Sequence, residues 1–129
     1  MSSTHSANPL ACSAGLAVIE EIEKKRLTQN AKKKGELLHK NLSKISRQHP
    51  GLMEINGKGL IAAMIFDKNY KNINFKLKKL VELCIKDGLL LVYTGRESVK
   101  IGPPLTITAS AINEATNIIE KNINRIFKK

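Results

Sequence analysis

Residues 10–19 form an almost unbroken apolar stretch, and this feature most restricts how the chain can fold. Asn8-Pro9 precedes the stretch and is typical of a helix start, because Asn can cap a helix and Pro suits the first helical position. Charged residues follow at Glu20-Glu21. A helix that begins apolar on every side is buried on several sides. A small single domain rarely provides such a place, so the pattern indicates a partner surface.

The rest of the chain alternates amphipathic helices with short extended runs separated by Gly and Pro. We predict helices over residues 10–25, 28–47, 75–87 and from about residue 108. We predict strands over residues 53–66 (interrupted at 57–59), 89–93 and 99–101. Few strands and amphipathic helices indicate an α+β fold of two layers, with helices on one face of a small, mostly antiparallel sheet.

The length of 129 residues suits one domain, and the core must be aliphatic because aromatic residues make up only 4% of the chain. Cys12 and Cys84 lie among aliphatic residues on predicted helices, so we expect both thiols to be buried. No Cys or His has the spacing of metal ligands, and we expect no metal site. No signal peptide opens the sequence, and no apolar run reaches the roughly 18 residues of a membrane span. We therefore expect a cytoplasmic protein without membrane contact.

The net charge is +11, from 22 Lys and Arg residues against 11 Asp and Glu residues. Such a surplus favours phosphate-bearing partners in general, and a small basic α+β module that binds RNA is the alternative function. The lysines are scattered, however, and few aromatic side chains are available to stack on bases. We therefore expect a solvated basic surface and no nucleic-acid partner.

Three motifs lie in order along the chain. Residues 3–12 read STHSANPLAC, residues 56–60 read NGKGL and residues 99–108 read VKIGPPLTIT. They resemble the S-T-x-x-x-N-P-L-x-C, R-G-x-G-L and R-x-x-P-P-L-x-I-x motifs of the class III aminotransferases, which depend on pyridoxal phosphate. Each motif alone is moderately specific. Their spacing and the helix patterns between them also match, so the resemblance covers essentially the whole chain.

The resemblance implies the aspartate-aminotransferase fold, with this chain as its C-terminal portion. Residues 1–27 are then a phosphate-contact segment and interdomain helix, and residues 28–129 are the small C-terminal domain. The resemblance also implies a cytoplasmic homodimer with pyridoxal 5'-phosphate bound at the subunit interface. The implied reaction transfers an amino group from a small-molecule donor to a 2-oxo acid. Candidate donors are amino acids and ω-amino compounds such as 4-aminobutyrate, acetylornithine or ornithine, although semialdehyde aminomutases share these motifs.

The resemblance assigns the candidate site residues. Thr4, with Ser3 beside it, matches a threonine that bonds the cofactor phosphate of the neighbouring subunit, and a helix start favours an anion there. Lys100 stands where the family has an arginine that binds the substrate carboxylate with two hydrogen bonds. Lysine keeps the charge but lacks the planar fork, so Arg96 is the alternative carboxylate ligand. Asn56 also replaces a family arginine, and we assign it no catalytic role. The alternative for Ser3 and Thr4 is that they are ordinary residues near a helix cap. The alternative for Lys100 and Arg96 is that they are solvated cations at a strand edge.

The catalytic lysine of the family, and the acidic partner of the cofactor's ring nitrogen, lie upstream of the Thr4 motif. No lysine of this chain has a matching setting, so we assign no catalytic residue to it. Met1 stands next to a motif that is internal in the family, which indicates a truncated gene or a partial reading frame. We expect the isolated chain to be inactive and to self-associate. A non-catalytic remnant that dimerises with relatives is a further alternative.

Overall fold

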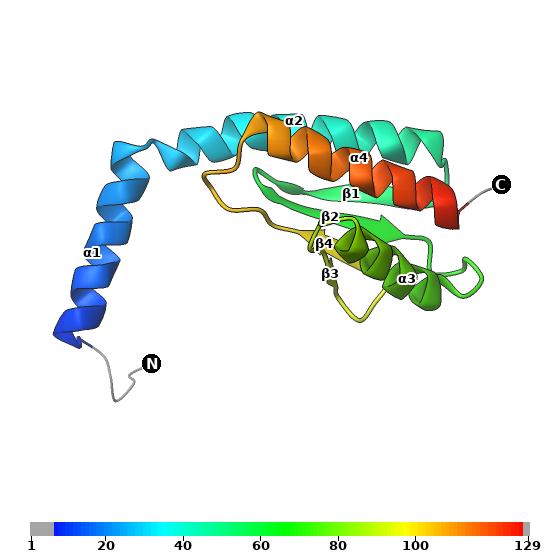
Figure 1. Ribbon diagram of the computed structural model, residues 1–129, viewed down its shortest axis with the longest axis horizontal. Helices are drawn as coiled ribbons and strands as arrows, with labels where there is room; N and C mark the ends of the chain where they lie inside the picture. Colours follow the sequence, from blue (N-terminus) through cyan, green and yellow to red (C-terminus); the bar gives the residue numbers. More distant parts are fainter. Residues whose placement is uncertain (1–6, 128–129) are drawn as a thin grey trace.

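The computed structural model describes residues 7–127 of the chain (Figure 1). The described residues form four helices and four strands, in the predicted order. In chain order these are α1 (Pro9–Lys24), α2 (Leu27–Gln48), β1 (Met53–Lys58), β2 (Ile61–Phe66), α3 (Ile73–Lys86), β3 (Val92–Tyr93), β4 (Ser98–Ile101) and α4 (Ala109–Ile126). None of the helices in this part of the chain combines the length and the apolar character needed to cross a bilayer.

The strands form one antiparallel sheet in the order β1-β2-β4-β3. Alternate residues of β2 and β4 are buried, and the residues between them are exposed or half-buried. The buried set comprises Ala62, Met64 and Phe66 of β2 with Val99 and Ile101 of β4. Because alternate residues of a strand point to opposite faces, one face of the sheet is covered and the other is not. The predicted α+β architecture is confirmed.

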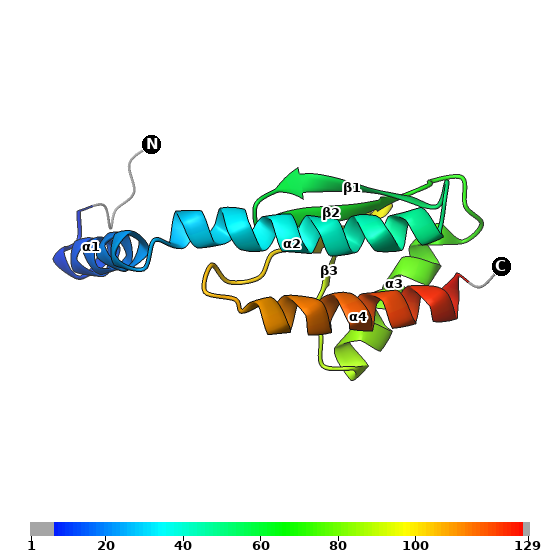
Figure 2. The ribbon, with the colours of Figure 1, turned by 90° about the horizontal axis from the view of Figure 1, so that it is seen from above.

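Helices α2, α3 and α4 share one core with the covered face of the sheet (Figure 2). The core is aliphatic, as predicted, and its residues recur three or four positions apart in each helix. They include Leu38, Leu42 and Ile45 of α2, Leu77, Leu80 and Cys84 of α3, and Ile112, Ile119 and Ile123 of α4. The apolar stripes read from the sequence therefore identify the core-facing side of each of these helices.

Helices α2 and α4 lie side by side and run in the same direction (Figures 1 and 2). Polar side chains connect the two helices next to this core. Asn41 Nδ2 donates to Asn113 Oδ1 at 3.0 Å, and one heptad further on Gln48 Nε2 donates to Glu120 Oε1 at 2.8 Å. The two pairs are seven residues apart on both helices. They are therefore compatible with one relative shift of the two parallel helices along their axes.

Two predicted boundaries are wrong. Residues 89–91 were expected to be extended, but Leu89 N donates to Cys84 O at 2.8 Å, so Leu89 belongs to the turn that ends α3. Gly88 precedes it with a left-handed φ of 89°, as a helix-ending glycine requires. The interruption predicted at residues 57–59 is also displaced, because Gly57 and Lys58 still pair with β2. The hairpin turns at residues 59 and 60 instead.

Helix α1 begins as predicted. Among the described elements it contacts α2, and no other element covers its apolar side chains. Asn8 Oδ1 accepts a hydrogen bond from Leu10 N at 2.9 Å, and Pro9 occupies the first turn. None of its residues is buried, and the helix extends away from the other elements (Figures 1 and 2). The prediction that Cys12 is buried is therefore wrong for this chain, whereas Cys84 is buried as predicted.

Candidate functional site

Lys100 lies in the middle of the uncovered face of the sheet. In the sheet register it pairs with Ala63 of β2 on one side and with Val92 of β3 on the other. Ala63 also pairs with Asn56 of β1, so these residues form one row across the strands, the Lys100 row. Directly opposite residues of antiparallel strands share a face. Both positions at which this chain replaces an arginine of the motifs therefore project from the same face.

The Lys100 row is flanked by apolar side chains of β2 and β3, and by the charged Glu54 and Lys58 of β1, which pair with Ile65 and Ile61. Ile61 and Ile65 flank Ala63 along β2 and are 62% and 39% exposed, and Val92 is 55% exposed. Within the described residues, Lys100 forms no ion pair. An ammonium group on an apolar surface interacts more strongly with an anion once that surface is covered, because the local dielectric constant falls. This face can therefore hold a carboxylate group.

Arg96 lies in the turn before β4 and not in the sheet. Thr94 and Ser98 close this turn, with 2.7 Å between their hydroxyl oxygens, and Arg96 O accepts a hydrogen bond from Ser98 N at 2.7 Å. Arg96 precedes Lys100 by four positions, which is at most roughly 13 Å of backbone. The two candidate carboxylate ligands therefore lie on different segments, Arg96 in an exposed turn and Lys100 in the sheet.

The Pro103-Pro104 segment links β4 to α4 and is tied to the start of α2. Asn30 Nδ2 donates to Leu105 O at 2.5 Å across this link. Proline restricts the backbone to extended angles, and the hydrogen bond holds the segment against the helix. The motif after Lys100 thus has a structural role.

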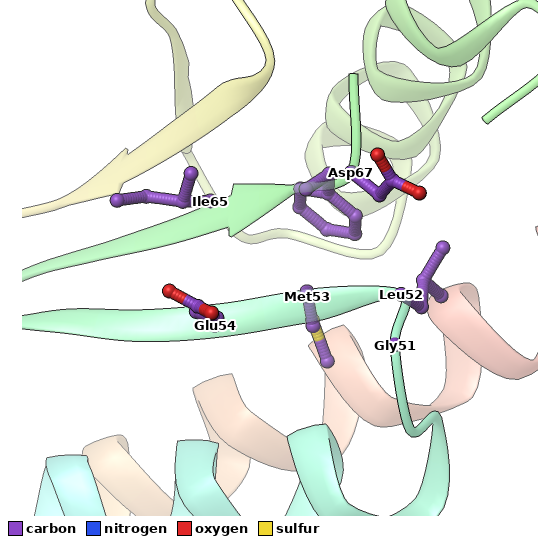
Figure 3. A pocket seen from close by; sticks show the side chains of 7 residues that line it. Gly51, Leu52, Met53, Glu54, Ile65 and Asp67 are labelled. Carbon is purple, nitrogen blue, oxygen red and sulfur yellow. The ribbon is translucent and has the colours of Figure 1, made fainter. Parts of the chain in front are cut away.

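A hollow of about 360 Å³ lies at the ends of β1 and β2. Figure 3 shows its lining, in which Glu54 and Asp67 project from neighbouring strand ends near Ile65. Asp67 Oδ1 accepts a hydrogen bond from Asn69 N at 2.9 Å, so this carboxylate stabilises the following turn. None of the predicted site residues lines this hollow, although Ile65 belongs both to its lining and to the flank of the Lys100 row. In the described part of the chain, no cluster of His, Cys, Asp or Glu could hold a metal ion.

Comparison with known proteins agrees with the motifs. The family model described as "Aminotransferase class-III" matches residues 1–123. The chain belongs to the class III aminotransferases. The acetylornithine aminotransferase of Prochlorococcus marinus is 36% identical to this aminotransferase chain over 128 residues, which are 98% of the chain and 29% of the relative. The enzyme of the same name from Synechocystis is 36% identical over 122 residues, 94% of the chain and 28% of the relative.

The crystal structure of acetylornithine aminotransferase from Elizabethkingia anophelis has the same fold in the matching part. It superposes with a TM-score of 0.85 and 28% sequence identity, over 97% of this aminotransferase chain and 32% of that one. The class III chain described here therefore spans less than a third of the length of the relatives it matches. The fold of the matching part is shared.

Class III aminotransferases use pyridoxal phosphate. In this aminotransferase chain the start of α1 offers few free donors to a phosphate group, because Pro9 has no N–H, Leu10 N donates to Asn8 Oδ1 and Cys12 N donates to Asn8 O. The described residues of α1 therefore do not by themselves fit a cofactor phosphate. The predicted contacts, Ser3 and Thr4, lie outside the described residues.

Proposed function

We propose that this chain provides the substrate-carboxylate side of a class III aminotransferase active site. The enzyme would transfer an amino group from an amino acid or ω-amine to a 2-oxo acid. One observation carries the proposal: Lys100, at the position of the family arginine, projects from the middle of the uncovered sheet face without an ion-pair partner in the described part of the chain. Pyridoxal phosphate, when bound in the complete enzyme, supplies the chemistry of amino transfer.

Lys100 holds one carboxylate oxygen of the substrate through a single charge-assisted hydrogen bond. Ala63 has a small side chain, which leaves room for the acid above the centre of the sheet. Asn56 lies two strands from Lys100, roughly 10 Å between backbones, so its amide can donate to the same acid over Ala63. Ile65 and Val92 present apolar surface to the carbon chain of the acid. These residues bind and orient the substrate.

The names of the relatives support one class of amino donor. The matched proteins include acetylornithine aminotransferases and an ornithine aminotransferase, so we favour a donor of this kind. We further propose that the enzyme is a cytoplasmic homodimer, in which residues 1–27 carry the phosphate contacts Ser3 and Thr4 and residues 28–129 form the small domain. The catalytic lysine then lies in the part of the relatives that this chain does not span, and the isolated chain is inactive.

The test is a chimeric enzyme in which this chain replaces the matching segment of the Prochlorococcus marinus acetylornithine aminotransferase. Lys100→Met is expected to raise the KM for the 2-oxo acid on the order of tenfold, and Lys100→Arg to lower it because two hydrogen bonds become available. Lys40→Met removes an exposed charge of α2 and is the matched control. Unchanged KM values in Lys100→Met for every carboxylate substrate would contradict the proposal, as would amino transfer by the isolated chain with added cofactor.

A further inference from the structure

The outer edge of β1 is not paired with a further strand in the described part of the chain. β1 is the first strand in the sheet order β1-β2-β4-β3, and it lies along the outer margin of the folded part (Figure 2). Four of its six residues are exposed. A free strand edge presents N–H and C=O groups that can pair with another strand, and proteins usually protect long edges of this kind. This edge is therefore a candidate interaction surface.

The backbone groups at this edge belong to Met53, Ile55 and Gly57. In an antiparallel ladder, successive residues direct their backbone groups alternately toward the neighbouring strand and away from it. Gly57 N donates to Asn56 Oδ1 at 2.7 Å, and Met53 O accepts from Ser46 Oγ of α2 at 2.7 Å, so both groups point away from β2. Ile55 lies between them and has the same direction. Among residues 7–127, no side chain or loop pairs with its N–H and C=O.

The exposed side chains of β1 are complementary in charge to a second copy of themselves. Glu54, Asn56 and Lys58 share the uncovered face of the sheet, because they alternate with the residues that face the core. Neither Glu54 nor Lys58 forms an ion pair within the described residues. When a second β1 lies antiparallel with its Asn56 opposite the first Asn56, Glu54 of each copy lies opposite Lys58 of the other. Opposite charges at directly opposed positions stabilise an antiparallel pair, whereas like charges destabilise it.

The same register also suits the backbone. It places Ile55 of each copy opposite Gly57 of the other, and both residues direct their N–H and C=O groups to the seam. Such a pair exchanges two hydrogen bonds, and twofold symmetry provides the pair twice. Gly57 N–H then leaves Asn56 Oδ1 for Ile55 O of the second copy. Gly57 has no side chain that could meet the Ile55 side chain of the second copy on the covered face.

We propose that the β1 edge binds the β1 edge of a second copy of this chain, antiparallel and centred on Asn56, so that one sheet continues through both copies. The occupant is a second copy because Glu54 and Lys58 complement each other across this strand only when the strand meets itself in this register. The seam is short, so its association depends strongly on concentration. The contact involves no residue of α1, and it does not rest on the proposed amino transfer.

The first test places a cysteine on the twofold axis. The parent chain for all variants carries Cys12→Ser, which removes the exposed thiol, and Leu16→Lys with Ile19→Lys, which reduce association through α1. Asn56→Cys is expected to form a disulfide between two copies under mild oxidation. The reason is that the Cα atoms of a directly opposed, non-hydrogen-bonded pair are about 4.5 Å apart, which suits a disulfide. Lys40→Cys, at an exposed position of α2, is the matched control.

The second test reverses charges and measures self-association by sedimentation velocity. Glu54→Lys alone and Lys58→Glu alone each place like charges opposite one another, and each is expected to weaken the apparent Kd on the order of tenfold. An equimolar mixture of the two variants is expected to associate at least as tightly as the parent, because every opposed pair is then Lys with Glu. Lys40→Glu changes the charge outside the seam and is expected to stay within about twofold of the parent.

Thermal unfolding of each variant establishes that it is folded. The proposal is overturned by a folded Asn56→Cys variant that forms no more disulfide between copies than Lys40→Cys. It is also overturned by charge variants whose mixture associates no better than either alone, since this excludes the Glu54–Lys58 register. A parent that stays monomeric at millimolar concentration would leave the edge to a strand of another protein, and this outcome overturns the proposal as well.

Discussion

Gly35 of α2 and Gly59 of the β1–β2 turn are in direct backbone contact, and a Cβ on Gly35 would lie 2.5 Å from Gly59 Cα. This contact sets how closely the helix approaches the hairpin. Gly35→Ala must push the two apart, and we expect a loss of about 1–3 kcal/mol in the free energy of unfolding. Gly15→Ala is the matched control, because nothing lies within 4 Å of that position. Urea unfolding measures both, and equal stability of Gly35→Ala and the parent would refute the contact.

The two cysteines differ in exposure and should differ in reactivity. Cys12 is exposed, whereas Cys84 is buried and burial raises the pKa of its thiol to about 11. Because the thiolate is the reactive form, we expect a thiol reagent to label Cys12 quickly and Cys84 only after unfolding. Cys12→Ser isolates the slow reaction. Slow labelling of Cys12 in the native chain would show that something covers α1.

The Asp87 carboxylate connects the end of α3 to α4 and makes the free energy of unfolding depend on pH. Its carboxylate accepts hydrogen bonds from Asn122 Nδ2 at 2.9 Å and Lys121 Nζ at 3.0 Å, and these hold its pKa below the ordinary value. A lowered folded pKa contributes stability above the unfolded pKa of about 3.9, and this contribution is lost as the pH falls through the folded pKa.

We therefore expect Asp87→Asn to lower stability at neutral pH and to flatten the decline of stability below about pH 4. Lys121→Met should have a smaller effect in the same direction, because Asn122 still donates to Asp87. Urea unfolding between pH 2 and 7 checks both, and an unaltered acid dependence in Asp87→Asn would exclude this origin.

The C-terminal end of α4 is anchored by aromatic packing. Phe127 is 4% exposed, and its ring centroid lies 5.6 Å from those of Phe66 and Tyr70. Phe127→Ala is expected to cost about 3–5 kcal/mol of unfolding free energy, because it leaves a cavity in this cluster. Phe75 is 73% exposed, and Phe75→Ala should change stability by no more than about 0.5 kcal/mol. Similar losses in both variants would contradict the packing described.

The apolar surface of α1 should make the isolated chain associate. Leu10, Leu16 and Ile19 are 80%, 62% and 54% exposed, and contiguous apolar surface of this kind is typical of interaction sites. We expect concentration-dependent association in sedimentation experiments, and a larger monomer fraction for the double variant Leu16→Lys with Ile19→Lys. A wild-type chain that stays monomeric and binds no hydrophobic dye would contradict this.

Some of the structure was predictable because the signals are local. Asn8 and Thr108 cap α1 and α4 with their side-chain oxygens, and Gly88 ends α3, each acting within one turn of the chain. The apolar stripes of α2, α3 and α4 follow the helical period, so the core-facing sides were also predictable. The exposure of Cys12 was not predictable, because burial of a residue in α1 depends on a surface that no described residue provides.

The sequence by itself determined the element types, the caps, the inward side of each core helix and the family motifs. Only the tertiary structure decided that Lys100 shares a row with Ala63 and Asn56, that Gly35 meets Gly59 and that His39 is left with a buried free nitrogen. The reason is that alternation along a strand specifies to which face of the sheet each side chain points. It does not specify which residue of the neighbouring strand lies beside it. Register and close approach depend on the packing of segments that are far apart in the chain.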